Sequence, residues 1–231
     1  MKDIVIIGAG IIGSFLAYDL SKYKLDVAVL EQNKDVACGA TKANSAIVHS
    51  GHDPKEGTLK ALLNVRGSRM YEDICARFDL HYRKIGAYVL ACGSEEENVV
   101  RKLQKQAEER GIPHALHNHD EILQNEPNLS DEVTLGLYLP STAIITPWSV
   151  ATVLMDNAIE RGVQLHLETK VLSIDKKEDY YEIDAHFDEM DAKLFNYKDE
   201  DIEIKEESEL NSIKKPDYST EHTGFNKRSM H

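Results

Sequence analysis

The stretch DIVIIGAGIIG, residues 3–13, decides the fold of the first part of this chain. It begins with a run of mostly β-branched apolar residues over 3–7, which is typical of a parallel strand buried on both faces. Glycines follow with GxGxxG spacing, and residues 14–22 then carry apolar side chains near helical spacing. A second buried strand, over 26–31, ends in an acid. We therefore predict a complete βαβ unit.

The three glycines and the acid together predict a dinucleotide site. Gly8 allows a tight turn, Gly10 lets the backbone approach a pyrophosphate, and Gly13 lets the helix pack closely on the strand. The first-turn N–H groups of the helix, near Ile12, can then face the phosphates. Glu31 can accept hydrogen bonds from both ribose hydroxyls, and it disfavours the 2′-phosphate of NADP. An ordinary strand–helix turn with an exposed acid is the structural alternative, and the unit does not separate NAD from FAD.

Residues 40–51, ATKANSAIVHSG, are almost entirely small. Small polar residues crowd exposed turns, so a loop tip would explain this composition. A segment pressed against a bulky ligand would explain it equally well. Composition by itself leaves both interpretations open.

Apolar periodicity predicts the remaining elements. We expect helices over 58–78, 95–110 and 147–161, a short helix at 120–123, and strands over 87–91, 135–139, 163–174 and 180–183. For the helix over 58–78, the expected inner face consists of Leu59, Leu62, Leu63, Met70, Ile74 and Cys75.

Composition and charge narrow the classes of partner. The 231 residues are 42% hydrophobic, which suits a folded core over most of the chain. A formal charge of -13 disfavours nucleic acid and anionic membranes as partners. No apolar run approaches the roughly 18–20 residues that span a bilayer, so we expect no membrane-spanning segment. Three cysteines without CxxC spacing argue against a disulfide framework and a zinc site, and they favour a cytoplasmic location.

The character of the chain changes at about residue 184. From there on acids outnumber bases, apolar residues are isolated and periodicity is lost. We expect an acidic and largely irregular tail over 184–231.

Residues 39–51, followed by 57–65 and by the pair Pro147-Trp148, resemble the FAD-dependent oxidoreductases of the D-amino-acid-oxidase superfamily. Within it, they are most similar to the branch of the bacterial glycerol-3-phosphate dehydrogenases and L-2-hydroxyglutarate oxidases. The resemblance covers about residues 1–180. It implies FAD as the cofactor, with residues 39–49 passing beside the pyrophosphate, the ribityl chain and the isoalloxazine. Beyond the βαβ unit, it implies cofactor contacts from Thr41, Lys42, Asn44, Ser45, His49 and the backbone of Val171.

His49 is the candidate catalytic residue. A histidine beside the flavin can contact the ring, orient the substrate or accept the hydroxyl proton, and we favour flavin contact over the role of base. An ordinary packed histidine is the alternative. His52 replaces an aromatic residue that the family often has near this turn, which weakens any substrate role there.

Other polar residues are better explained by structure than by chemistry. Arg66 and Arg69 lie three apart on a helix and could reach a phosphate or carboxylate, but such a face is usually solvated. Three histidines, His114, His117 and His119, lack an acid or cysteine at ligand spacing, so we predict no metal site.

The predicted fold class is α/β: a Rossmann-like FAD-binding βαβ unit with part of a mixed-sheet substrate domain. We assign residues 1–80 to the FAD-binding part, 81–145 to a partial substrate domain, and 146–183 to a return to the FAD-binding part. Members of the family that this sequence resembles are longer than this chain. The strand that leads back into the nucleotide sheet, and the C-terminal half of the site, are not recognisable here, so we expect a truncated chain.

Two functions follow from this resemblance. In the first, the chain is an enzyme that oxidises a small hydroxy substrate, glycerol 3-phosphate or a 2-hydroxy acid, by hydride transfer to FAD. In the second, it is a truncated and inactive relative that binds nucleotide weakly or needs a partner subunit to complete the site.

Overall fold

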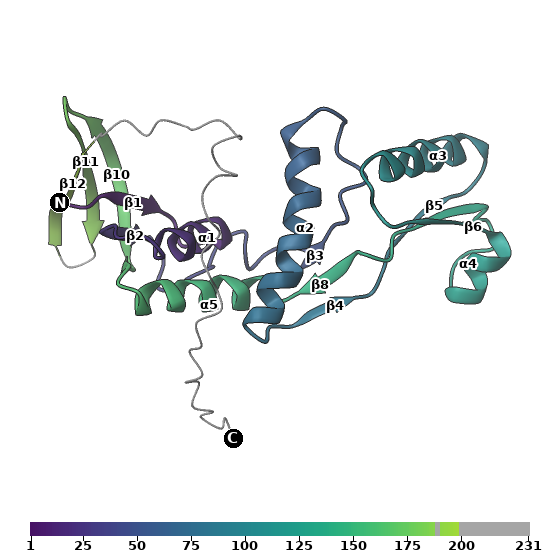
Figure 1. Ribbon diagram of the computed structural model, residues 1–231, viewed down its shortest axis with the longest axis horizontal. Coiled ribbons are helices and arrows are strands. Elements are labelled where there is room, and N and C mark those ends of the chain that lie inside the picture. Colours follow the sequence, from purple (N-terminus) through teal and green to yellow (C-terminus); the bar gives the residue numbers. More distant parts are fainter. Residues whose placement is uncertain (188–189, 199–231) are drawn as a thin grey trace, which may run out of the picture. The chain divides into compact units, whose positions relative to one another are not determined.

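The computed structural model describes residues 1–187 and 190–198 (Figure 1). In chain order its elements are β1 (Ile4–Ile7), α1 (Ile11–Leu20), β2 (Val27–Leu30), β3 (Ile47–Val48), α2 (Leu59–Arg77), β4 (Tyr82–Lys84), β5 (Tyr88–Ala91), α3 (Ser94–Glu109), β6 (Ala115–Asn118), α4 (His119–Asn125), β7 (Leu135–Tyr138), β8 (Ala143–Ile145), α5 (Pro147–Glu160), β9 (Gln164–His166), β10 (Thr169–Lys176), β11 (Tyr180–Phe187) and β12 (Met190–Lys198). The α/β class predicted from the sequence is confirmed. Among the described helices, none combines the length and the apolar character needed to cross a bilayer.

The nucleotide sheet is parallel and has the order β1-β2-β9. All four residues of β2 are buried, as its continuous apolar sequence predicts. Helices α1 and α5 lie against each other beside this sheet (Figure 1), and Ala17 and Met155 from the two helices share a core with Val27 and Val29. The predicted βαβ unit is therefore present, with its strands paired in parallel.

Strand β9 corrects the expectation that no strand leads back into this sheet. The chain returns along α5, and β9 pairs with β2 from Ala28↔Gln164 to Leu30↔His166. The sequence over 163–174 reads as one strand, but Glu168 has a φ of 53° and separates β9 from β10. A strand of three residues is too short to recognise by periodicity.

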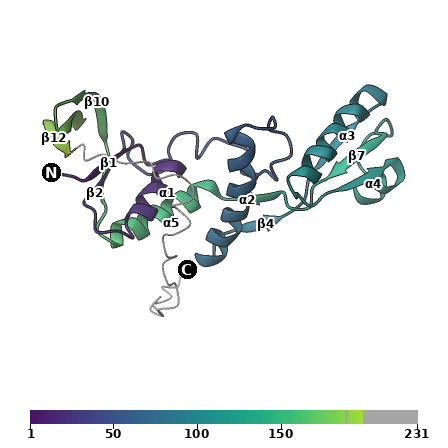
Figure 2. The ribbon, with the colours of Figure 1, turned by 45° about the horizontal axis from the view of Figure 1, so that its top comes forward.

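Two antiparallel sheets, β3-β8-β4 and β5-β7-β6, follow the nucleotide sheet. Helices α3 and α4 cover opposite faces of β7 (Figure 2). Side chains alternate along a strand, so neighbouring residues of β7 contact different helices. Leu137 packs in one cluster with Val100 of α3, whereas a Cβ on Gly136 would lie 2.9 Å from Ile122 of α4.

Helix α2 buries few of its side chains: Ala61 in its first half and Ile74 and Cys75 near its end, while Val65 packs partly buried against the cluster of Val100 and Leu137. Ile74 and Cys75 are buried with residues of β8 and α5, as predicted. Four other residues of the expected inner face are exposed: Leu59, Leu62, Leu63 and Met70. This expectation was wrong because the sheet β3-β8-β4 meets the C-terminal turns of α2, and periodicity cannot show how much of a helix is covered.

Strands β10, β11 and β12 form an antiparallel sheet that extends into the region expected to be irregular. Strand β11 continues to Phe187, and β12 spans Met190–Lys198, so this expectation was wrong for the described residues up to 198. Ile183 and Ala185 are buried, and their spacing of two places both on one face of β11. The remainder of the expected tail, 199–231, lies outside the described residues.

Candidate functional site

The turn between β1 and α1 brings the helix unusually close to the strand. Gly8 has a φ of 97°, a conformation that residues with a side chain rarely adopt. A Cβ on Gly13 would lie 1.9 Å from the backbone oxygen of Gly8, so only glycine permits this approach. At Gly10 a Cβ would lie 3.2 Å from the Thr41 hydroxyl. The structure thus explains all three glycines, while their contact with a pyrophosphate stays a prediction.

Glu31 ends β2 and is only 6% exposed. Its Oε2 accepts a hydrogen bond from the backbone N–H of Ala9 at 2.7 Å, within the glycine turn. Its Oε1 accepts from the backbone N–H of Asn33 at 2.9 Å and from the side-chain amide of Asn33 at 2.6 Å. A carboxylate has about four acceptor positions, so Glu31 can still receive a ribose hydroxyl while it braces the turn.

Two polar side chains shape the segment of small residues. The Thr41 hydroxyl accepts a hydrogen bond from the N–H of Ile11 at 2.9 Å, so it caps a first-turn donor of α1. The Asn44 amide donates to the carbonyls of Ala40 and Thr41, and its oxygen accepts from the N–H of Ala46 at 2.7 Å. Asn44 therefore braces its own loop, in addition to any contact with a cofactor.

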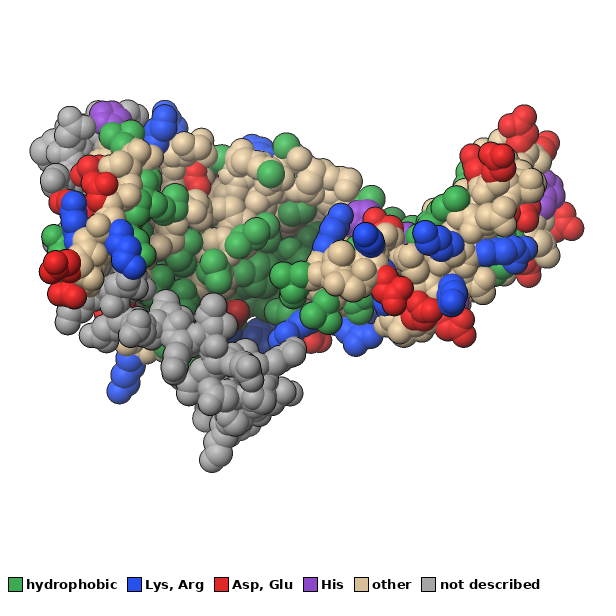
Figure 3. Space-filling view, turned by 90° about the horizontal axis from the view of Figure 1, so that it is seen from above, with side chains coloured by type: hydrophobic (Ala, Val, Ile, Leu, Met, Phe, Trp, Pro, Cys, Tyr) green, Lys and Arg blue, Asp and Glu red, His purple; other side chains and the backbone are tan. Residues whose placement is uncertain are grey.

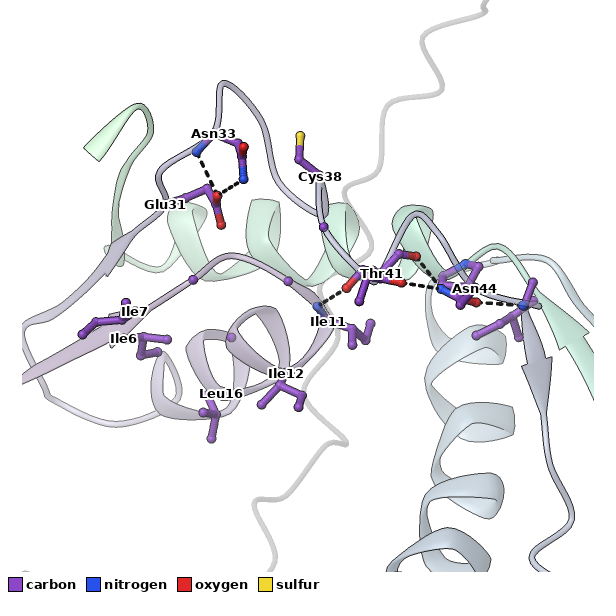
Figure 4. A pocket seen from close by; sticks show the side chains of 18 of the residues that line it. Ile6, Ile7, Ile11, Ile12, Leu16, Glu31, Asn33, Cys38, Thr41 and Asn44 are labelled. Carbon is purple, nitrogen blue, oxygen red and sulfur yellow. Dashed lines mark hydrogen bonds between the residues drawn. The ribbon is translucent and has the colours of Figure 1, made fainter. Parts of the chain in front are cut away.

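These residues surround a cavity of about 710 Å³. Figure 4 shows Glu31 and Asn33 at one end, Asn44 at the other, and Thr41 beside the first turn of α1 between them. Seven residues predicted to bind the cofactor line this cavity: Gly8, Gly10, Ile12, Gly13, Glu31, Thr41 and Asn44. The order of acid, glycine turn and small-residue loop matches the order of ribose, pyrophosphate and flavin in an extended dinucleotide.

Four predicted cofactor residues lie elsewhere. Lys42 and Ser45 are exposed and are not among the residues that line the cavity. Val171 lies in β10, where it is paired with Ala185 of β11. His49 is exposed and lines a different, smaller cavity. Cofactor contacts from these four residues stay predictions.

Some residues of the large cavity were not recognised from the sequence. Asn33 holds Glu31, and its only signal was an amide two positions after the acid. Cys38 is exposed at the rim, and Tyr71 and Pro147 line the cavity from α2 and α5. Tyr71 carried no signal, because its place depends on how α2 packs.

The smaller cavity is about 290 Å³, and Ile47 lines both it and the large cavity. The polar residues of the smaller cavity come from the loop after β3, from β5 and from the turn before β8: His49, His52, Asp53, Tyr88 and Thr142. The Ser50 hydroxyl lies 3.2 Å from Nδ1 of His52. The structure therefore groups the two histidines, although only His49 was a candidate from the sequence.

Burial lowers the pKa of His52 from its usual value of 6.5. Asp53 opposes this effect, while His49 and Arg110 add to it. The neutral imidazole is thus favoured at pH 7 in the folded chain. A neutral histidine can accept a proton, which suits a cavity where a hydroxyl group would be oxidised.

We expect the folded chain to lose stability through His52 as the pH falls through 6.5, the pKa of an unperturbed histidine. Below that pH the unfolded state binds a proton that the folded state resists, so the free energy of unfolding decreases. The His52→Gln variant cannot titrate and should show a shallower decrease. Urea unfolding of both proteins at about pH 7.5 and about pH 5.5 measures the difference.

The control for this measurement is a second histidine, His166, which is present in both the unchanged chain and the His52→Gln variant. Burial also lowers the pKa of His166, which is unchanged in the variant, so subtraction isolates His52. Equal decreases in the two proteins would contradict the prediction.

The other polar candidates occupy ordinary positions. Arg66 and Arg69 are exposed and line a groove of about 800 Å³ along α2. The three histidines make separate contacts: His114 with the Ile112 carbonyl, His117 with the Tyr88 hydroxyl and His119 with the Val133 carbonyl. Within the described residues, no three metal-binding side chains come together.

The parallel sheet, the glycine turn and the buried acid define a dinucleotide-binding protein of the Rossmann type. The chain belongs to the DAO family, the FAD dependent oxidoreductases, whose family model matches residues 3–192. The resemblance proposed from the sequence is confirmed, and the cofactor of this family is FAD.

Three relatives illustrate the similarity. A glycerol 3-phosphate dehydrogenase of Caloramator mitchellensis is 40% identical over 194 residues, covering 84% of this chain and 40% of that protein. An L-2-hydroxyglutarate dehydrogenase of Escherichia coli (strain K12) is 29% identical, covering 76% and 42%. The structure of the L-alpha-glycerophosphate oxidase of Mycoplasma pneumoniae, with FAD bound, has a TM-score of 0.75 at 28% identity, covering 79% and 49%. The chain thus spans less than half the length of each of these proteins.

The residues present fit FAD. A Cβ on Gly10 would lie 3.2 Å from the Thr41 hydroxyl, so a side chain at position 10 would crowd Thr41 at the wall of the cavity. Glu31 has acceptor capacity for the ribose, and the loop over 39–46 offers mainly small side chains along the rest of the cavity. Gly8, Gly10, Gly13, Glu31 and Thr41 are the residues that would hold the cofactor.

Proposed function

We propose that this chain provides the FAD-binding half of an oxidoreductase that oxidises glycerol 3-phosphate or a 2-hydroxy acid. One observation carries the proposal: Ile47 lines both the large cavity and the cavity of the two histidines. A cofactor that extends from Glu31 past Thr41 would reach the cavity of His49 and His52. The relatives, a glycerol 3-phosphate dehydrogenase and an L-2-hydroxyglutarate dehydrogenase, support a small anionic alcohol as the substrate.

When bound, FAD accepts a hydride from the carbon that carries the hydroxyl group. The task of this chain is to hold the cofactor, to place the hydroxyl group and to take up its proton. His49 faces the smaller cavity and can accept that proton or contact the flavin. Burial keeps His52 neutral, so it offers a second acceptor beside His49.

A second candidate function, a chain that needs a partner subunit to complete its site, is favoured by exposed apolar residues beside the large cavity. Ile7 is 52% exposed, Ile12 is 75% exposed and Leu16 is 48% exposed, and all three line that cavity. Hydrophobic side chains gather in a hollow over this region of the molecule (Figure 3). Such a patch is typical of a surface that another segment covers.

We also propose a cytoplasmic location. Cys38 and Cys92 are exposed free thiols, and Cys75 is a buried one. Exposed free thiols suit a reducing compartment.

The test is to titrate the purified full chain with FAD and to record the visible spectrum of the bound flavin. Glycerol 3-phosphate and L-2-hydroxyglutarate are then added separately without oxygen, and loss of the oxidised flavin absorbance reports hydride transfer. Bleaching by either substrate supports the first function. Binding of FAD without bleaching supports the second. A chain that takes up no FAD would contradict the first function.

A further inference from the structure

Arg110 ties the end of α3 to the loop that follows the small-residue segment. Its Nη1 donates hydrogen bonds to the carbonyls of Gly51, at 2.7 Å, and His52, at 3.0 Å. Its Nη2 donates to the carbonyl of Pro54 at 2.5 Å. One guanidinium thus holds three carbonyls within four consecutive residues, across more than fifty positions of sequence.

This loop is also packed against α2. Gly51 has a φ of 92°, and a Cβ there would lie 2.7 Å from the Val65 side chain. Ser50, Gly51 and Pro54 are buried. The loop, which contains His52, is therefore held both by α2 and by Arg110.

We propose that Arg110 is a positioning residue that holds the loop over 51–54 so that His49 and His52 face the smaller cavity. This assignment rests on the proposed function for its catalytic meaning, but the contacts do not depend on it. The planar guanidinium carries five donors in a fixed fork, whereas the ammonium of lysine is a single point charge. Lysine at position 110 can therefore keep the charge without holding all three carbonyls.

Arg110 also acts on the loop through its charge. It lowers the pKa of His52, in addition to the effects of burial and of His49, and against that of Asp53. Removing the positive charge should therefore raise the pKa of His52. A residue that only filled space would not produce this change.

The test compares the full chain with its Arg110→Ala and Arg110→Lys variants. Amide hydrogen exchange measures the loop at residues 51–53, and NMR titration measures the pKa of His52. Both variants should exchange about tenfold faster or more in the loop, because a hydrogen bond from a charged group is lost. The pKa of His52 should rise in Arg110→Ala and rise less in Arg110→Lys.

Arg101→Ala is the matched control, because Arg101 is an exposed arginine on the same helix that pairs with Glu97 at 3.8 Å. It should leave both readouts unchanged. Residues 27–30 of β2 report global unfolding, and equal acceleration there would overturn the local assignment. Unchanged loop exchange in Arg110→Ala, or full restoration by lysine, would also overturn it.

These measurements need no cofactor. If the chain takes up no FAD, the proposed function fails while the exchange data still decide the role of Arg110. If FAD binds and the loop exchange is insensitive to position 110, the proposal for Arg110 fails by itself.

Discussion

Alanine in place of Gly13 is expected to abolish FAD binding and to lower the free energy of unfolding by roughly 2–3 kcal/mol, at the upper end of the usual cost of overpacking. The added Cβ would lie 1.9 Å from the backbone oxygen of Gly8, where no flexible side chain can move away. Helix α1 must shift, and its shift displaces both the glycine turn and the contact between Thr41 and Ile11.

Urea unfolding and titration with FAD measure these two effects of Gly13→Ala. Gly67→Ala is the matched control, since Gly67 lies inside α2 and an added Cβ there meets nothing within 4 Å. That variant should be stabilised by about 0.5–1 kcal/mol, because alanine loses less backbone entropy than glycine in a helix. A Gly13→Ala protein with normal stability and FAD affinity would show that the tight approach of helix and strand is dispensable.

The second large effect is expected from Glu31→Ala, which should weaken FAD binding by about a hundredfold. The carboxylate is the acceptor for the N–H of Ala9 and for two donors of Asn33. Its removal leaves these donors unpaired and removes the predicted acceptor for the ribose, and a hydrogen bond to a charged group contributes about 1.5–3 kcal/mol. The free energy of unfolding should also decrease, by roughly 1–3 kcal/mol, the usual cost of unsatisfied buried donors.

Flavin fluorescence during titration measures the affinity of Glu31→Ala for FAD. Glu31→Gln keeps one acceptor oxygen in the same place and should lie between the alanine variant and the unchanged chain. Glu108→Ala removes the same charge from an exposed position on α3 and serves as the control. Equal affinities of Glu31→Ala and Glu108→Ala would exclude a role for Glu31 in the site.

The sequence predicted the first part of the fold well because its signals are local. An apolar strand, a glycine turn and a helix follow one another within twenty residues, and each has a pattern that needs no distant partner. The residues over 39–51 likewise pointed to a flavin because their order resembles a family. The predicted burial of the first strand on both faces was wrong, because β1 lies at the edge of the sheet and Ile7 is 52% exposed. The other predictions that were wrong concern features that depend on packing between distant segments: the exposed residues of α2, the strand β9, and the strands β11 and β12.

In the candidate site, too, residues in a local motif were predicted and a residue without such a motif was missed. Gly8, Gly10, Gly13 and Glu31 were assigned from spacing alone, and all four line the large cavity. Asn33 was missed because an amide two positions after an acid is common in loops.

The sequence by itself determined the βαβ unit and the membership of the family, because both depend on residues close together along the chain. Only the tertiary structure decided that His49 and His52 share a cavity with Tyr88, and that Arg110 holds their loop. These residues come together because β8 pairs with β3, just before the histidine loop, and because the end of α3 packs against that loop. Distances across such separations depend on the whole path of the chain, which no local pattern contains.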